Sequence, residues 1–133
     1  MTLRLLLSLT LCLPIFSKPT PLVPNQVVVV YNSTLPKSKE LAEFYALNRL
    51  IPPSNLIGLE VPEKTTIDRT TYETAIRQPL VKKFTENQWW ELGKDQTGTS
   101  IPLKTKIRCI ALMKGIPLRI SREAVPKNEE SAT

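Results

Sequence analysis

Four consecutive valines, Val27 to Val30, restrict the fold of this chain more than any other feature of its sequence. Branched side chains favour strands, and a valine run without polar alternation is typical of a strand that is covered on both faces, as in a parallel sheet. A polar turn, Asn32-Ser33-Thr34, and an amphipathic helix that ends at Pro52-Pro53 follow. The segment 26–51 therefore predicts the opening of an α/β domain.

The predicted helix has Pro36 near its first turn, with Ser33, Thr34 or Ser38 as capping groups. Its apolar residues fall mostly on one side, which is the pattern of a helix that covers one face of a sheet. These residues are Leu41, Phe44, Tyr45, Leu47 and Ile51.

Two further strands and a second helix are expected. Residues 55–61 predict the second strand, bounded by Pro62 and a polar loop through Thr66, and 106–114 predict the third. Between them, Thr70 and Glu73 have capping-box spacing and a stripe recurs every fourth residue at Tyr72, Ile76, Leu80 and Phe84. Pro79 predicts a kink or a second helix start, and the helix is expected to reach Trp89-Trp90 and to end at Gly93. Residues 94–105 read as a loop, and 118–120 as a short extended piece.

This order of elements predicts a small three-layer α/β fold, Rossmann-like or flavodoxin-like. It has about three parallel strands, the first strand in the middle, and helices on both faces. Residues 26–122 are expected to form the domain, with an extended proline-rich leader at 18–25 and a disordered polar tail at 123–133.

The first 17 residues predict a secretory signal peptide. Arg4 precedes an apolar run from Leu5 to Phe16, which is shorter than the roughly 20 residues that a membrane-spanning helix needs. Cleavage near Ser17 is expected to leave no membrane span, and it places the mature protein in the periplasm or outside the cell. A lipoprotein signal at Cys12 is a less favoured alternative, because bulky Leu11 precedes it.

Cleavage also removes Cys12 and leaves Cys109 as the single cysteine, within the apolar run 107–112. No intrachain disulfide is then expected, and a cysteine in such a run usually behaves as a small hydrophobic residue.

The mature chain is basic, because loss of Arg4 lowers the net charge only from +6 to +5. Most of the excess lies in a stretch without acidic residues, between Asp95 and Glu123. Its cations suit an anionic ligand or a membrane surface, or they are simply solvated charges on loops and strand ends. They are Lys104, Lys106, Arg108, Lys114, Arg119 and Arg122. An exported chain is not expected to bind nucleic acid.

The sequence contains no histidine. This excludes a Ser-His-Asp triad, a Cys-His dyad and any histidine-ligated metal within the chain, and no paired-carboxylate pattern replaces them. The first turn lacks the glycine pattern of dinucleotide-binding folds, and residues 93–100 lack the lysine of a phosphate loop. No cofactor or catalytic residue is predicted.

The candidate ligand site follows from the predicted topology. In a doubly wound sheet the ligand crevice lies beyond the carboxyl ends of the strands, where the winding reverses. The residues expected at this rim are Asn32, Ser33, Thr34, Lys114, Gly115 and Arg119. A plain helix cap and turn is the simpler interpretation of the first three. The Trp89-Trp90 pair is either a sugar-stacking platform or, more in keeping with aromatic burial, one ring in the core and one on the surface.

Several spaced blocks cover most of residues 26–120. They are 27–32, Ser38, 41–46, 49–52, 55–56, Tyr72, Ile76, 79–80, 107–108 and 114–118. Taken together, these blocks resemble an uncharacterised family of exported bacterial proteins that co-occurs with the exosortase protein-sorting system. The family has no assigned catalytic residues, and its members are longer. The resemblance therefore implies that this chain matches their N-terminal part and that its domain is truncated.

Two functional hypotheses follow. In the first, the chain is a non-catalytic or accessory cell-envelope module that binds a partner or an anionic ligand at the rim. In the second, it is the N-terminal fragment of a longer hydrolase, of the caspase-like peptidase type, whose catalytic residues lie elsewhere. A three-stranded sheet also leaves edge strands open, which predicts self-association.

Overall fold

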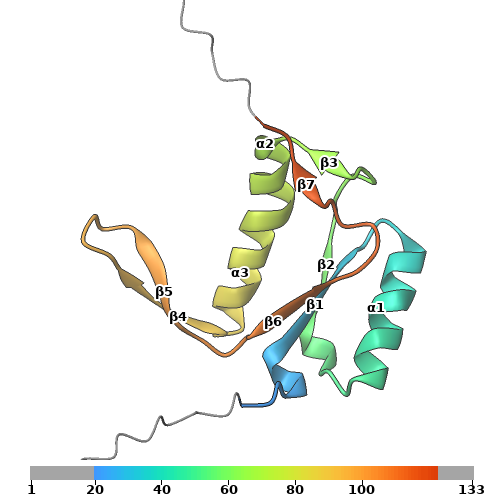
Figure 1. Ribbon diagram of the computed structural model, residues 1–133, viewed down its shortest axis with the longest axis horizontal. Helices are drawn as coiled ribbons and strands as arrows, with labels where there is room; N and C mark the ends of the chain where they lie inside the picture. The colour runs from blue at the N-terminus through green and yellow to red at the C-terminus, as the bar shows by residue number, and fades with distance from the viewer. Residues whose placement is uncertain (1–19, 123–133) are drawn as a thin grey trace, which may run out of the picture.

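The computed structural model describes residues 20–122 and forms a three-layer α/β domain (Figure 1). Its main sheet is parallel, with strand order β2-β1-β6. Helix α1 (Pro36–Asn48) covers one face of this sheet, and α3 (Gln78–Glu86) covers part of the other. This confirms the predicted fold class, including the central place of the first strand. The predicted signal peptide and tail, and the start of the leader, lie outside the described residues.

Strand β1 (Val27–Asn32) forms the centre of the core. It pairs in parallel with β2 (Leu56–Leu59) on one side and with β6 (Cys109–Leu112) on the other. Successive side chains of a strand point to opposite faces, so Val28 and Val30 enter the core under α3, and Val27 and Val29 enter the core under α1. The valine run is therefore buried on both faces, as the sequence predicted.

Helix α1 (Pro36–Asn48) faces the sheet with a different side from the one expected, although Tyr45 and Ile51 of the predicted stripe do pack against this core. Its buried residues are Ser38, Ala42 and Ala46, whereas the large apolar residues Leu41, Phe44 and Leu47 are exposed by 43%, 66% and 77%. The prediction that this apolar stripe covers the sheet was wrong for these three residues. The small side chains let the helix backbone lie close to the valine-lined sheet, where larger side chains would not fit.

The start of α1 also differs from the prediction. Its N-cap is Leu35, which makes no side-chain capping bond, and Ser38 Oγ instead accepts a hydrogen bond from the Asn32 N–H. The helix ends before Arg49, because Leu50 adopts a left-handed conformation (φ 56°) ahead of the proline pair.

The second helical segment has three parts. A turn of α-helix, α2 (Arg69–Tyr72), leads into a π-helical turn (Glu73–Arg77) and then into α3 (Gln78–Glu86). Pro79 lies in the first turn of α3, as the two-helix alternative predicted. Asp68 caps α2 by accepting a hydrogen bond from the Thr71 N–H, and this bond lowers the pKa of the Asp68 carboxyl.

The helix ends at Glu86, well before Gly93, because Gln88 takes a left-handed conformation (φ 51°). Residues 90–93, predicted as the end of this helix, belong instead to β4 (Trp90–Lys94). Much of the predicted loop 94–105 forms β5 (Ser100–Thr105), which pairs antiparallel with β4. The resulting hairpin projects from the body of the domain (Figure 1). Those two predictions were wrong, because pairing between the two strands of a hairpin decided the structure there, and helical periodicity does not reveal such pairing.

The hairpin turn is organised by Asp95. Its carboxylate accepts hydrogen bonds from the Thr97 hydroxyl and from the backbone N–H groups of Thr97 and Thr99. The bond from the Thr97 side chain, together with these amides, lowers the pKa of Asp95.

A second small parallel pair lies at the other end of the domain. β3 (Thr66–Ile67), in a segment predicted as loop, pairs with β7 (Arg119–Ile120), which matches the predicted extended piece. Short 3-10 turns at Pro24–Gln26 and Pro53–Asn55 precede β1 and β2. No helix among residues 20–122 is long and apolar enough to cross a membrane.

Candidate functional site

The predicted rim is centred on Asn32, which lies at the carboxyl end of β1 and is fully buried. Its amide nitrogen donates to the carbonyl oxygens of Val61, at 2.9 Å, and Gly115, at 3.1 Å. Its amide oxygen accepts from the N–H and the hydroxyl of Thr34. All hydrogen-bonding positions of this side chain are therefore used inside the protein. Asn32 holds three segments together and offers nothing to a ligand.

The structure brings some of the other predicted rim residues close to Asn32. The bond from Asn32 brings Gly115 beside the first turn, as the topology predicted, while Ser33, Thr34 and Lys114 are exposed around it. Gly115 has φ 99°, and a Cβ there would lie 2.7 Å from Leu35 Cδ1. The Leu35 side chain could move away from such a Cβ, so the positive φ is the feature that favours glycine here.

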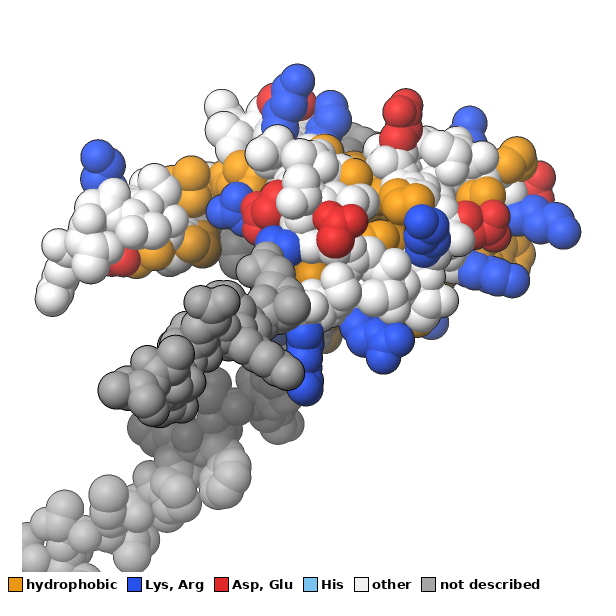
Figure 2. Space-filling view, turned by 90° about the horizontal axis from the view of Figure 1, so that it is seen from above, with side chains coloured by type: hydrophobic (Ala, Val, Ile, Leu, Met, Phe, Trp, Pro, Cys, Tyr) orange, Lys and Arg blue, Asp and Glu red, His pale blue; other side chains and the backbone are white. Residues whose placement is uncertain are grey.

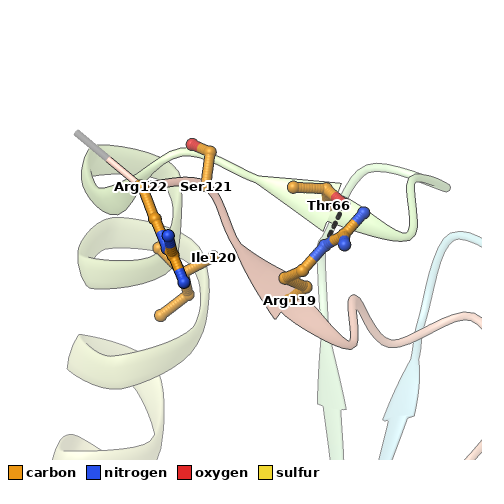
Figure 3. A pocket seen from close by; sticks show the side chains of 5 residues that line it. All are labelled: Thr66, Arg119, Ile120, Ser121 and Arg122. Carbon is orange, nitrogen blue, oxygen red and sulfur yellow. Dashed lines mark hydrogen bonds between the residues drawn. The ribbon is translucent and has the colours of Figure 1, made fainter. Parts of the chain in front are cut away.

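Arg119 belongs to a different surface. Its Nε donates to Thr66 Oγ1 at 3.1 Å, which links β7 to β3 (Figure 3). Thr66, Arg119, Ser121 and Arg122 line an open hollow of about 610 Å³. The two guanidinium groups lie on different sides of β7 in Figure 3, so they do not converge on one anion.

Cations elsewhere are similarly dispersed. On the face seen in Figure 2, Lys and Arg side chains are scattered among neutral and apolar ones. Lys104 pairs with Glu91 at 3.1 Å across the β4–β5 hairpin. This distribution favours solvated charges over a single concentrated anion site.

An apolar groove, which sequence reasoning missed, lies between the second helical segment and the chain from β6 to β7. It has a volume of about 430 Å³. One wall comprises Tyr72, Ile76 and Leu80, and the other comprises Leu112 and residues 116–120. The helical stripe was visible in the sequence, but it was assigned entirely to the core. The groove exists because α3 covers only part of its face of the sheet.

Strand β6 shows that α3 leaves part of this face of the sheet uncovered. Ile110 is paired with Val28, and Leu112 with Val30, so both lie on the α3 face of the sheet. They are nevertheless exposed by 46% and 54%. On β2, the opposite edge strand, Ile57 and Leu59 are buried. Among residues 20–122, only the β6 side of this face is therefore left open.

The aromatic pair packs mostly inward. The ring of Phe84 contacts Trp89 edge-on, with centroids 5.3 Å apart, and Trp90 at 5.2 Å. Trp89 is buried and Trp90 is half-buried, with its Nε1 donating to Thr85 Oγ1. This arrangement matches the expectation of one ring in the core and one near the surface.

Side chains that could act in catalysis or bind a metal are few in the part of the chain that the structure describes. Cys109 is half-buried against the α1-side core, and no cluster of three potential metal ligands occurs among residues 20–122. Comparisons with protein-family models, with curated proteins and with solved structures gave no match to this chain.

Proposed function

We propose that this protein is an exported, non-catalytic accessory module of the cell envelope that binds a protein partner in the groove beside β6. The observation that carries the proposal is an apolar groove that continues onto the uncovered side chains of Ile110 and Leu112. Exposed apolar surface of this kind is typical of an interaction site. Arg119 lines the groove, and exposed Lys114 lies in the chain between the groove residues Leu112 and Ile116; both favour a partner with anionic groups.

Site-specific photocrosslinking in the host envelope tests this proposal. A photoreactive amino acid is placed at Leu118 in the groove wall and, as a matched control, at Leu50 beyond the end of α1. Both side chains are 79% exposed. We expect a discrete adduct of higher mass from position 118 and none from position 50, because only the former borders the groove. Equal crosslinking at both positions, or none at either, would contradict the proposal.

A second candidate function is supported by the same open strand. A longer hydrolase, of the caspase-like peptidase type, would continue the sheet beyond β6, and its catalytic residues would lie in that additional sequence. The intact mass of the native product in separated cell fractions distinguishes the two. A product that extends beyond residue 133 and carries further strands supports the hydrolase. A periplasmic or secreted product of residues 18–133 supports the accessory module.

A further inference from the structure

Strand β6 is an unprotected edge of the main sheet. Among the described strands it pairs only with β1. Natural edge strands are commonly protected by a proline, an inward charge or a covering element. The residues of β6, Cys109 to Leu112, include neither proline nor charge, and both Ile110 and Leu112 are exposed.

The backbone of β6 is also available for pairing. The Met113 N–H donates to the Val30 carbonyl at 2.8 Å, so Met113 directs its amide toward β1. Amide groups of successive strand residues point to opposite sides, and Ile110 and Leu112 therefore direct their N–H and C=O groups away from β1. The same two residues thus offer both backbone hydrogen bonds and apolar side chains to an added strand.

Positive charges stand at both ends of this edge. Lys106 and Arg108 precede β6, and Lys114 follows it. None of the three forms an ion pair with an acidic side chain in the described part of the chain. Arg108 instead donates to the backbone carbonyls of Thr20 and Pro21. The edge therefore combines an apolar centre with cationic ends.

This charge pattern disfavours a second copy of the chain as the occupant of the β6 edge, that is, as the strand that pairs with β6. If two β6 strands paired antiparallel across a two-fold axis with Ile110 opposite Leu112, Arg108 of each copy would lie opposite Lys114 of the other. Like charges directly opposite one another destabilise strand pairs.

We infer that the occupant is an extended segment of another protein that adds as a strand to β6, with apolar residues at alternate positions and carboxylates at both ends. Main-chain hydrogen bonds would provide affinity, and side chains on the α3 face would enter the groove beside Leu112. The flanking carboxylates would meet Arg108 and Lys114. This inference rests on the proposed partner-binding function and specifies the chemistry of the partner.

The test uses the exported chain and a fluorescent heptapeptide, Asp-Thr-Val-Thr-Val-Thr-Asp, which places its valines and both aspartates on one face of the added strand. Binding is measured by fluorescence anisotropy at low and moderate salt. We expect saturable binding that weakens as salt screens the end charges. A peptide with lysines in place of both aspartates, and one N-methylated at every residue between them, should each bind at least about tenfold more weakly, because they lose the charge or the backbone donors.

Protein variants locate the site. Ile110→Lys with Leu112→Lys should abolish binding of the aspartate peptide, while Leu41→Lys with Leu47→Lys on α1, which adds the same charge at exposed leucines, should have less than about a twofold effect. Lys114→Glu should weaken peptide binding. It should also promote dimers in sedimentation experiments, because glutamate would then face Arg108 in the paired copies.

Three outcomes would overturn the inference. They are absence of peptide binding, equal binding of the N-methylated peptide, and dimerisation of the unaltered chain that is lost on Ile110→Lys with Leu112→Lys. In any of these cases, a specific crosslink from Leu118 would still support the groove as a partner site. Failure of the inference is therefore distinguishable from failure of the proposed function.

Discussion

Replacing Asn32 by aspartate is expected to lower the free energy of unfolding by about 3 kcal/mol or more at neutral pH. The change keeps the shape of the side chain but replaces its two N–H donors with an oxygen. That oxygen would face the carbonyl groups of Val61 and Gly115 in a site without solvent exposure. Urea unfolding followed by tryptophan fluorescence measures the effect.

The matched control is Asn48→Asp. Asn48 also donates its side-chain amide to a carbonyl, that of Phe44 at 2.7 Å, but at an exposed position. Water can replace that bond, so we expect a loss below about 1 kcal/mol. Similar losses for the two variants would show that Asn32 does not hold the three segments together.

The second large effect is expected from Ala46→Leu, which should destabilise the fold by about 2 kcal/mol. Ala46 is 5% exposed and packs with Ala42, Val27 and Val29 between α1 and the sheet. Three additional carbon atoms would separate the helix from the strands or force side chains out of their preferred rotamers.

Leu47→Ala is its control, since Leu47 is the adjacent residue and is 77% exposed. We expect a change within about 0.5 kcal/mol, because little buried surface is lost and alanine favours helix. The apolar pattern of the sequence predicts the reverse, with Leu47→Ala the more destabilising of the two substitutions. Thermal or urea unfolding of both variants therefore tests directly which side of α1 faces the sheet.

The candidate site was only partly predictable. Topology correctly brought Asn32 and Gly115 together, because the carboxyl ends of neighbouring parallel strands share one edge. Topology did not reveal that the Asn32 side chain donates its hydrogen bonds to the carbonyl groups of Val61 and Gly115. Nor did it reveal that Arg119 donates a hydrogen bond to Thr66 at a different surface. The Asn32 bonds depend on which buried carbonyls lack other partners, and the Arg119 bond depends on the pairing of β3 with β7. Both are properties of the assembled chain.

The groove was not predictable for a related reason. Tyr72, Ile76 and Leu80 have the spacing of a core-facing stripe, and periodicity alone cannot say how far a helix extends over a sheet. The uncovered side of β6 arises from the position of α3 relative to the strands. That position is fixed by the packing of Phe84 and Trp89 with the core around Val28 and Val30.

The sequence by itself determined the elements whose signal is local. A valine run defines a buried strand, and Pro36 and Pro79 mark the first turns of α1 and α3. The order of strands and helices then implies a parallel sheet with its first strand in the middle. Tertiary structure alone decided the face of α1, the β4–β5 hairpin, the bonding of Asn32 and the open edge at β6. Each of these depends on close packing or pairing between separate segments, and such interactions outweigh local preference where that preference is weak.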